Sequence, residues 1–386
     1  MNDIKISVIM TTMNCREYLE RSIYSFLRQT LKEMELICVD GNSKDGTREY
    51  IEYMSAIDNR IRIVNEEGIG IGGAKNTGIR YSKGEFVTFL DADDFYVDER
   101  ALNLMYSAAK KNDVKICGGL RTLIFNDGSV TDEPLHRNDC INNPGGVLIY
   151  YRDKQYDYHF HSYIYDRKML LDGKIFFAEA RCYDDTHFFI RAMLKAEKFY
   201  VVPVELYRYL VGEPYCWGMD KTEDALIQFI DQLHLSADNN LERLHYLTVL
   251  RMNYEYAENF IRNIRNGDLN ALKLLIEAND AIDIELITTA RHESFPVDYL
   301  ETMLHRDRKD CPIRCVDNGH STVYVLEPLW EIMNCDDNSY IKEKINKLEE
   351  EIKTSRWRYE HIEKSLSYRI GMAITFIPRK LRKHLG

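Results

Sequence analysis

Long apolar segments are missing from this sequence of 386 residues. No stretch reaches the roughly 18 uninterrupted apolar residues that a membrane-spanning helix requires. The first six residues pass directly into a strand-like segment, without the basic region, apolar region and cleavage site of a signal peptide. We therefore expect a protein that does not span a membrane and is not exported by way of a signal peptide.

The sequence also lacks an excess of positive charge and an ordered set of cysteines. It has 51 Lys and Arg against 62 Asp and Glu, a formal net charge of -11 at pH 7. Because nucleic-acid binding needs a basic face, nucleic acid is not expected as the principal partner. The nine cysteines are scattered and odd in number, unlike a disulfide framework, which indicates the reducing cytoplasm.

What the sequence does contain is typical of a globular protein, with 45% apolar and 29% charged residues. Its length exceeds that of a single hydrophobic core, so a second module is expected. In residues 1–120 short apolar runs alternate with helical patterns, which predicts a parallel sheet covered on both faces. The fold class is therefore α/β, with a doubly wound, Rossmann-like, mostly parallel sheet in a domain of residues 1–218. Ligands of such sheets bind at the carboxyl ends of the strands.

Acidic side chains follow two of the predicted strands. The strand over 86–90 continues into Asp-Ala-Asp-Asp at 91–94, and the strand over 36–39 continues into Asp40. Like charges so close repel, so we expect a hard cation or a hydrogen-bonding ligand to neutralise them. Taken alone, each segment favours a solvated turn, because Asp, Asn and Gly are common turn residues.

A glycine-rich segment, residues 68–78, leads into a predicted helix. Glycines let a backbone approach a ligand closely, and a helix N-terminus presents N–H groups and a favourable dipole to an anion. Glycine spacing alone is weak evidence for a binding site, but it is stronger evidence in combination with the two acidic segments.

In their residue sequences and in their order along the chain, these segments resemble those of the GT-A-fold glycosyltransferases of family 2. The resemblance covers about the first 215 residues, and the ordered set is more specific than any single motif. It implies an inverting, metal-dependent transfer of a sugar from a nucleotide diphosphate sugar to an acceptor hydroxyl. The matching positions are 7–14, 18–19, 22–23, 29–30, 39–40, 43, 45–47, 70, 74–79, 84–86 and 89–94.

The resemblance also implies roles for individual residues on the donor side. Asp93 and Asp91 form the Asp-x-Asp element that would hold Mg or Mn at the donor diphosphate. Asp40 would accept from a ring N–H of the base, preferably uracil, although Asp-Gly-Asn-Ser at 40–43 departs from the family's common Asp-Asp-Gly-Ser. The remaining donor-binding residues would be Thr11, Asn14, Lys75 and Ala92, together with Asp91.

An inverting transfer also needs a general base to take the acceptor proton. The family places it in an acidic pair at a helix start, which matches Asp184 and Asp185, with Asp185 as the base. For the pair alone, plain capping of the helix by acids is the alternative interpretation. Asp184 and His161 are expected on the acceptor side, whereas a metal shared by His159 and His161 is not expected, because no further ligand stands at a recognisable spacing.

The sequence changes character beyond residue 218. Helical periodicity predicts an all-helical module over 219–335. Within the last region, 336–386, a heptad pattern over 339–366 predicts a coiled-coil-like helix that either joins copies of the chain or packs into the helical module. The segment 369–386 combines an apolar patch with Arg and Lys and no acid, which suits either peripheral contact with the inner face of the cell membrane or a frayed soluble end.

The predicted function is that of a cytoplasmic hexosyltransferase-type enzyme of surface polysaccharide biosynthesis. Its expected partners are a UDP-sugar donor and a saccharide or lipid-linked acceptor. A nucleotidyltransferase that forms nucleotide sugars also sets paired acids and a glycine-rich loop on a parallel sheet, but it would release diphosphate. The third class is a non-catalytic scaffold, which absence of metal-dependent nucleotide binding would favour.

Overall fold

The computed structural model describes residues 4–133, 135–212, 218–292, 313–317 and 322–334. The chain divides into two compact units, Met1–Tyr215 and Cys216–Gly386, and each is described by itself below. The predicted coiled-coil-like helix and the basic tail lie outside the described residues. Among the described residues, no helix combines the length and the apolar composition that crossing a bilayer would need.

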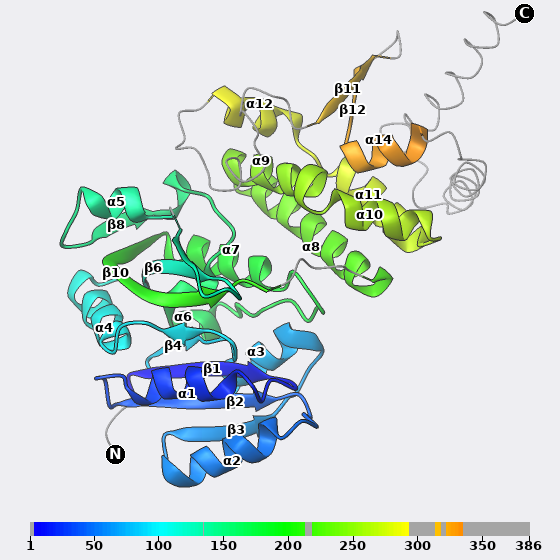
Figure 1. Ribbon diagram of the computed structural model, residues 1–386. Coiled ribbons are helices and arrows are strands. Elements are labelled where there is room, and N and C mark those ends of the chain that lie inside the picture. Colours follow the sequence, from blue (N-terminus) through cyan, green and yellow to red (C-terminus); the bar gives the residue numbers. More distant parts are fainter. Residues whose placement is uncertain (1–3, 134, 213–217, 293–312, 318–321, 335–386) are drawn as a thin grey trace, which may run out of the picture. The chain divides into compact units, whose positions relative to one another are not determined.

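Ten described strands form the sheet of unit 1 (Figure 1). They are β1 (Ile6–Thr12), β2 (Met34–Asp40), β3 (Ile61–Asn65), β4 (Phe86–Phe89), β5 (Phe95–Tyr96), β6 (Ile116–Ile124), β7 (Val130–Asp132), β8 (Val147–Tyr150), β9 (Tyr163–Asp166) and β10 (Lys198–Leu210). The order is β3-β2-β1-β4-β9-β6-β10-β5, with β7 beside β6 and β8 beside β10. The pairings run β1, β2, β3, β4, β6 and β10 in one direction and the other strands in the opposite one. The predicted α/β class with a mostly parallel sheet is confirmed.

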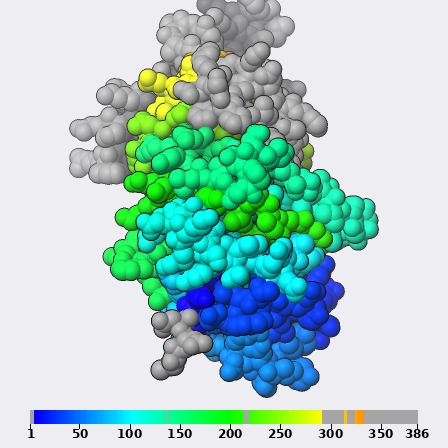
Figure 2. All heavy atoms as spheres, turned by 90° about the vertical axis from the view of Figure 1, so that its left-hand side faces the viewer, coloured from blue at the N-terminus to red at the C-terminus, as the bar shows by residue number. Residues whose placement is uncertain are grey.

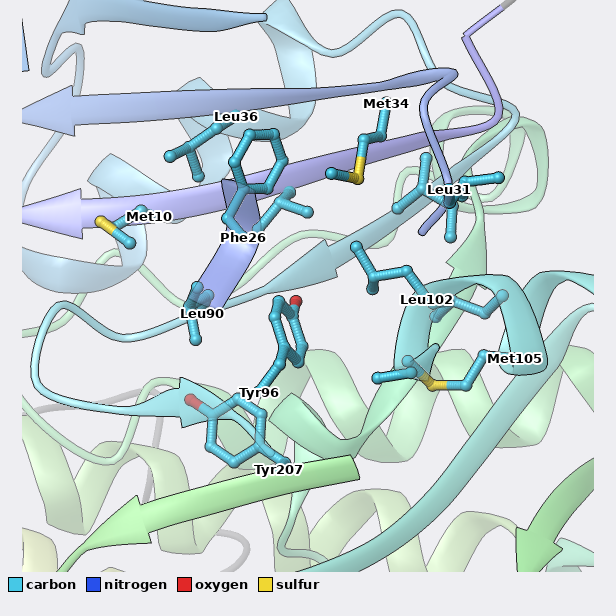
Figure 3. Close-up of a cluster of buried hydrophobic side chains, with 14 of the residues drawn as sticks. Met10, Phe26, Leu31, Met34, Leu36, Leu90, Tyr96, Leu102, Met105 and Tyr207 are labelled. Carbon is cyan, nitrogen blue, oxygen red and sulfur yellow. The ribbon is translucent and has the colours of Figure 1, made fainter. Parts of the chain in front are cut away.

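Helices cover both faces of this sheet. They are α1 (Leu19–Leu27), α2 (Thr47–Ile57), α3 (Gly70–Tyr81), α4 (Ala101–Asn112), α5 (Arg137–Ile141), α6 (Arg167–Asp172) and α7 (Asp185–Ala196), with the short 3₁₀ turns η1 (Tyr151–Asp153) and η2 (Phe160–Ser162). On one face, Phe26 of α1 and Leu102 of α4 share a core with Met10 of β1 (Figure 3). On the other face, Ile9 of β1 faces α3, and Phe89 of β4 packs against rings of α7 and the segment before it. Successive strand residues point to opposite faces, so the apolar runs fill both layers.

Burial along β2 shows the consequence of this layering. All seven residues of Met34–Asp40 are buried, as expected for a strand with helices on both sides. In the space-filling view, the segments of unit 1 from the N-terminal strands through α4 pack into one continuous surface (Figure 2).

Unit 2 is helical in its described part, with one exception. Its helices are α8 (Met219–Asp238), α9 (Glu242–Leu250), the π-helical turn η3 (Arg251–Glu255), α10 (Ala257–Arg265), α11 (Leu269–Asp280), α12 (Ile284–His292) and α14 (Glu327–Asn334). The exception is an antiparallel pair, β11 (Arg314–Asp317) and β12 (Thr322–Val325). The predicted helical C-terminal module is confirmed, but it is not all-helical, because the β-branched and aromatic residues of Thr322–Val325 favour a strand.

Candidate active site

The acidic segments lie at one edge of the sheet, because β2 and β4 both pair in parallel with β1. Thr12 lies opposite Asp40, and Ile9 lies opposite Phe89, the last residue of β4. The turn that follows β4, residues 91–94, is called the acidic turn below. The structure thus brings Asp40 and the acidic turn to the carboxyl ends of neighbouring strands, with Thr11 on the strand between them.

The protein holds the acidic turn through its carbonyl groups. The Ser22 hydroxyl donates to the carbonyl oxygens of Ala92 and Asp94 at 2.6 and 2.5 Å. The Arg21 guanidinium donates to the carbonyl oxygen of Asp93 at 2.7 Å. Both donors come from α1, and these bonds do not use the carboxylates of Asp91 and Asp93.

Asp94, in contrast, is bound into the fold by its carboxylate. It is fully buried and accepts from the Tyr207 hydroxyl and from the Leu210 backbone N–H, both at 2.7 Å. Burial and the neighbouring carboxylates raise the pKa of Asp94 well above its usual value. The Tyr207 hydroxyl also accepts from the backbone N–H of Asp91 at 3.2 Å. Asp94 therefore ties the acidic turn to the end of β10.

His161 contacts the first carboxylate of the acidic turn. Its Nε2 lies 2.8 Å from Asp91 Oδ2, and the ring is 8% exposed. Burial raises the pKa of Asp91, but the opposite effects of His161 and Lys75 are larger together and bring this pKa down to about 2. The carboxylate is therefore charged. His159 contacts a different carboxylate, Glu133, at 2.9 Å. The structure thus places His161 beside the Asp-x-Asp element, to which the sequence did not link it.

The acidic turn fits a divalent cation that is shared with a substrate. Burial and the adjacent Asp91 raise the pKa of Asp93, so a cation between these two carboxylates would relieve their repulsion. In the described parts of the chain, no group of three or more His, Cys, Asp or Glu could hold a metal by itself. Magnesium commonly uses one or two carboxylates together with substrate phosphates, and Asp91 and Asp93 would supply the carboxylates.

Asp40 belongs to a second hydrogen-bonded group at the same edge. It is 2% exposed, and its two oxygens accept from the Ser43 hydroxyl at 2.6 Å and from Arg48 at 3.3 Å. Ser43 Oγ also accepts from the Asn14 backbone N–H at 3.0 Å, and Asn14 Oδ1 accepts from the Lys44 N–H at 2.8 Å. Asn14 and Asp40 are therefore positioned by one segment. Arg48 was missed in the sequence, where nothing distinguishes it from a solvated helical arginine.

The glycine-rich start of α3 packs against the protein's own chain. A Cβ on Gly72 would lie 1.8 Å from the carbonyl oxygen of Ala178, and one on Gly70 would lie 2.5 Å from that of Ala180. Asn76 adds two hydrogen bonds with the Phe177 backbone, at 2.9 and 2.8 Å. The close approach that the sequence predicts for a ligand is thus made at Gly70 and Gly72 by the segment that leads into α7.

Gly72→Ala is expected to lower the free energy of unfolding by about 3 kcal/mol, because the Ala178 carbonyl group and the Asp184 Cβ leave no room for the methyl group. Thermal or urea unfolding of the purified variant measures the change. Gly145→Ala is the control, since nothing lies within 4 Å of a Cβ at that position. Equal stability of both variants would contradict the packing described for α3.

Lys75 lies inside this contact. It is 4% exposed, its Nζ lies 3.1 Å from Asp184 Oδ2, and the Phe160 and Phe177 rings lie 4.5 and 4.9 Å from the ammonium. Asp184 occupies the N-cap position of α7 but makes no side-chain cap hydrogen bond. Plain helix capping therefore does not account for Asp184.

Asp185 is the first residue of α7 and is partly exposed. Burial and the neighbouring Asp184 raise its pKa to about 6, against the opposing effect of Lys75. A carboxylate with a pKa near the working pH is suited to proton transfer. The electrostatic influence of Lys75 reaches Asp184, Asp91 and Asp185, which links the helix start to the acidic turn.

Comparisons with known proteins find relatives of this chain. Residues 7–173 match the family model of glycosyl transferase family 2. The uncharacterized glycosyltransferase EpsJ of Bacillus subtilis is 27% identical over 226 residues, 56% of this chain and 65% of that protein. The β-1,3-glucosyltransferase WfgD of Escherichia coli, which is named for UDP-Glc and α-D-GlcNAc-diphosphoundecaprenol, is 34% identical over 160 residues, 40% of this chain and 62% of that protein. The chain spans somewhat less than two thirds of these two relatives.

Solved structures support the fold. Residues 1–349 of S. aureus TarS, in complex with UDP-GlcNAc, superpose with a TM-score of 0.60 at 16% identity, covering 83% of this chain and 99% of that one. At this identity the likeness concerns the fold alone. The domain matched at residues 7–173 is thus identified as one of glycosyl transferase family 2.

Proposed function

We propose that the protein transfers a sugar from a nucleotide diphosphate sugar to a hydroxyl of a saccharide or lipid-linked acceptor in polysaccharide biosynthesis. The observation that carries the proposal is a chain of contacts that leads from the start of α7 to the acidic turn. Lys75 is buried against Asp184 and against the ring of Phe160. The next residue, His161, contacts Asp91. The match of residues 7–173 to glycosyl transferase family 2 supports glycosyl transfer as the reaction. The printed acceptor of WfgD supports a lipid-linked acceptor.

On the donor side, Asp91 and Asp93 would hold Mg or Mn together with the diphosphate. When bound, the cation would stabilise the charge that grows on the departing diphosphate. Asp40 would accept from a uracil ring N–H through Oδ1, which accepts one hydrogen bond, from the Ser43 hydroxyl, whereas Oδ2 already accepts from the Ser43 backbone N–H and from Arg48. Thr11, Asn14 and the backbone of Ala92 complete the proposed donor site.

On the acceptor side, Asp185 would take the proton of the acceptor hydroxyl. The hydroxyl oxygen bonds to the anomeric carbon while the bond from that carbon to the diphosphate oxygen breaks on the opposite face, which inverts the anomeric configuration. With a pKa near 6, Asp185 is mostly ionised at pH 7, and activity should fall as the pH drops below 6.

A thermal-shift panel of nucleoside diphosphates, with and without Mn, tests the donor site. UDP with Mn is expected to raise Tm by several degrees, and more than ADP, GDP or CDP with Mn, because binding to the native state stabilises it. UDP alone should give a smaller shift. If no nucleoside diphosphate shifts Tm in the presence of metal, this proposal fails and a non-catalytic scaffold is favoured instead. Product analysis then distinguishes the two enzyme classes: a glycosyltransferase forms a glycoside and releases a nucleoside diphosphate, whereas a nucleotidyltransferase releases diphosphate.

Contact with a membrane and pairing of chains belong to the same proposal. A lipid-linked acceptor would bring the enzyme to the inner membrane face, where the cations of 369–386 would meet anionic lipid. The heptads of 339–366 would join two copies. Both segments lie outside the described residues, so the proposal rests on their sequence.

A further inference from the structure

Three charged groups of unit 1 meet where α3 faces the start of α7. The ammonium of Lys75 contacts the carboxylate of Asp184 at 3.1 Å, and both side chains are more than nine-tenths buried. An ammonium or carboxylate left alone in such surroundings is strongly disfavoured. Lys75 and Asp184 therefore depend on each other for their charged states.

The backbone around this pair leaves Lys75 little freedom to move toward another ligand. Asn76, the next residue, is joined by two hydrogen bonds to Phe177. The Cβ of Asp184 lies only 3.2 Å from the position of a Cβ on Gly72, one turn earlier in α3. The segment before α7 and the first turns of α3 thus form one packed contact, with the ammonium against two aromatic rings that also contact each other.

Asp185 lies in the field of this pair. The groups that act on its carboxylate are Asp184 and, more weakly, Asp157, which disfavour its ionisation, and Lys75, which favours it. The Tyr165 hydroxyl on β9 is also within electrostatic range and is protonated at neutral pH, because burial raises its pKa well above the usual value. Lys75 is the cation among these groups, so its charge offsets that of Asp184.

We propose that Lys75 is a positioning residue for the carboxylate pair: it neutralises Asp184 and holds the start of α7, which leaves Asp185 as the member of the pair that takes the acceptor proton. This inference rests on the proposed function. It gives Lys75 a role different from the donor binding that was predicted for it from the sequence.

The pH dependence of kcat/KM tests this role in four proteins, the wild type, Lys75→Met, Asp184→Asn and the double variant. Removal of the cation should move the acidic limb of the profile up by about one pH unit, and removal of the adjacent carboxylate should move it down by a similar amount. The double variant should return the limb close to the wild-type position. The donor KM should stay within about threefold in all four proteins.

A role in donor binding predicts a different result, a raised donor KM in Lys75→Met with an unmoved acidic limb, and that result overturns the inference. Limbs that stay in place, or that move in the same direction in both single variants, also overturn it. If Lys75→Met does not fold, Asp184→Asn and the double variant carry the test, since the double variant leaves no buried charge unpaired. Lys75→Arg should keep the wild-type limb. A wild-type protein that transfers no sugar would refute the proposed function itself, whereas an active wild type without these shifts refutes only the role of Lys75.

Discussion

Asp185→Asn is expected to lower kcat by roughly 10²–10⁴-fold, because the amide cannot take the acceptor proton while the substitution conserves shape and volume. Nucleoside diphosphate release, together with mass-spectrometric detection of the glycoside, measures the loss. Donor binding should be unchanged, since Asp185 acts on the acceptor. The acidic limb near pH 6 should disappear from the residual activity.

Asp172→Asn provides the matched control. Asp172 is the last residue of α6, its side chain is 62% exposed, and its partner Lys168 lies one turn earlier in the same helix. The control should keep wild-type activity. An Asp185→Asn variant that retains more than about a tenth of wild-type kcat would remove Asp185 from the role of general base.

Asp93→Ala is expected to lower transfer by about 10³-fold or more, because the cation at the diphosphate contributes several kcal/mol to the transition state. Calorimetric titration with UDP should show that Mn no longer strengthens binding. The fold should survive, since Arg21 binds the carbonyl oxygen of Asp93, which alanine retains. Full activity in this variant would refute the metal assignment.

The adjacent Asp94→Ala is the informative comparison for Asp93→Ala. It removes the acceptor of two donors, the buried Tyr207 hydroxyl and the half-buried Leu210 N–H, at about 1–3 kcal/mol for each group left unsatisfied. Tm should therefore fall by several degrees in Asp94→Ala and stay unchanged in Asp93→Ala. Equal Tm values in the two variants would contradict the assignment of Asp94 to fold stability and of Asp93 to metal binding.

The sheet could be predicted because its signals are local. The apolar run of β2 and the helical spacing of α1 each follow from neighbouring residues, and the polar residues that follow β2 and β4 mark where these strands end. The antiparallel β9 could not be foreseen, since the direction in which it enters the sheet depends on the path of the chain between β6 and β9. The pair β11 and β12 was missed because two strands of four residues give a weak signal.

The partners of the site residues were less accessible to sequence reasoning. Lys75 and Asp184 are 109 residues apart, and His161 and Asp91 are 70 residues apart. No local pattern states which carboxylate a buried Lys or His will meet. The burial of Lys75 could therefore not be predicted: a lysine in a helix is ordinarily solvated, whereas here the segment before α7 covers it.

By itself, the sequence determined the layered sheet, the acidic residues at the strand ends and the acidic pair at a helix start, because periodicity, turn chemistry and motif order are properties of contiguous residues. The tertiary structure decided that Asp94 supports the fold while Asp91 faces His161, that Asp40 is paired with Arg48, and that Lys75 is buried against Asp184. These contacts depend on which distant segments pack together and exclude water. A charge buried in this way is costly unless an opposite charge or a hydrogen-bonding group lies beside it.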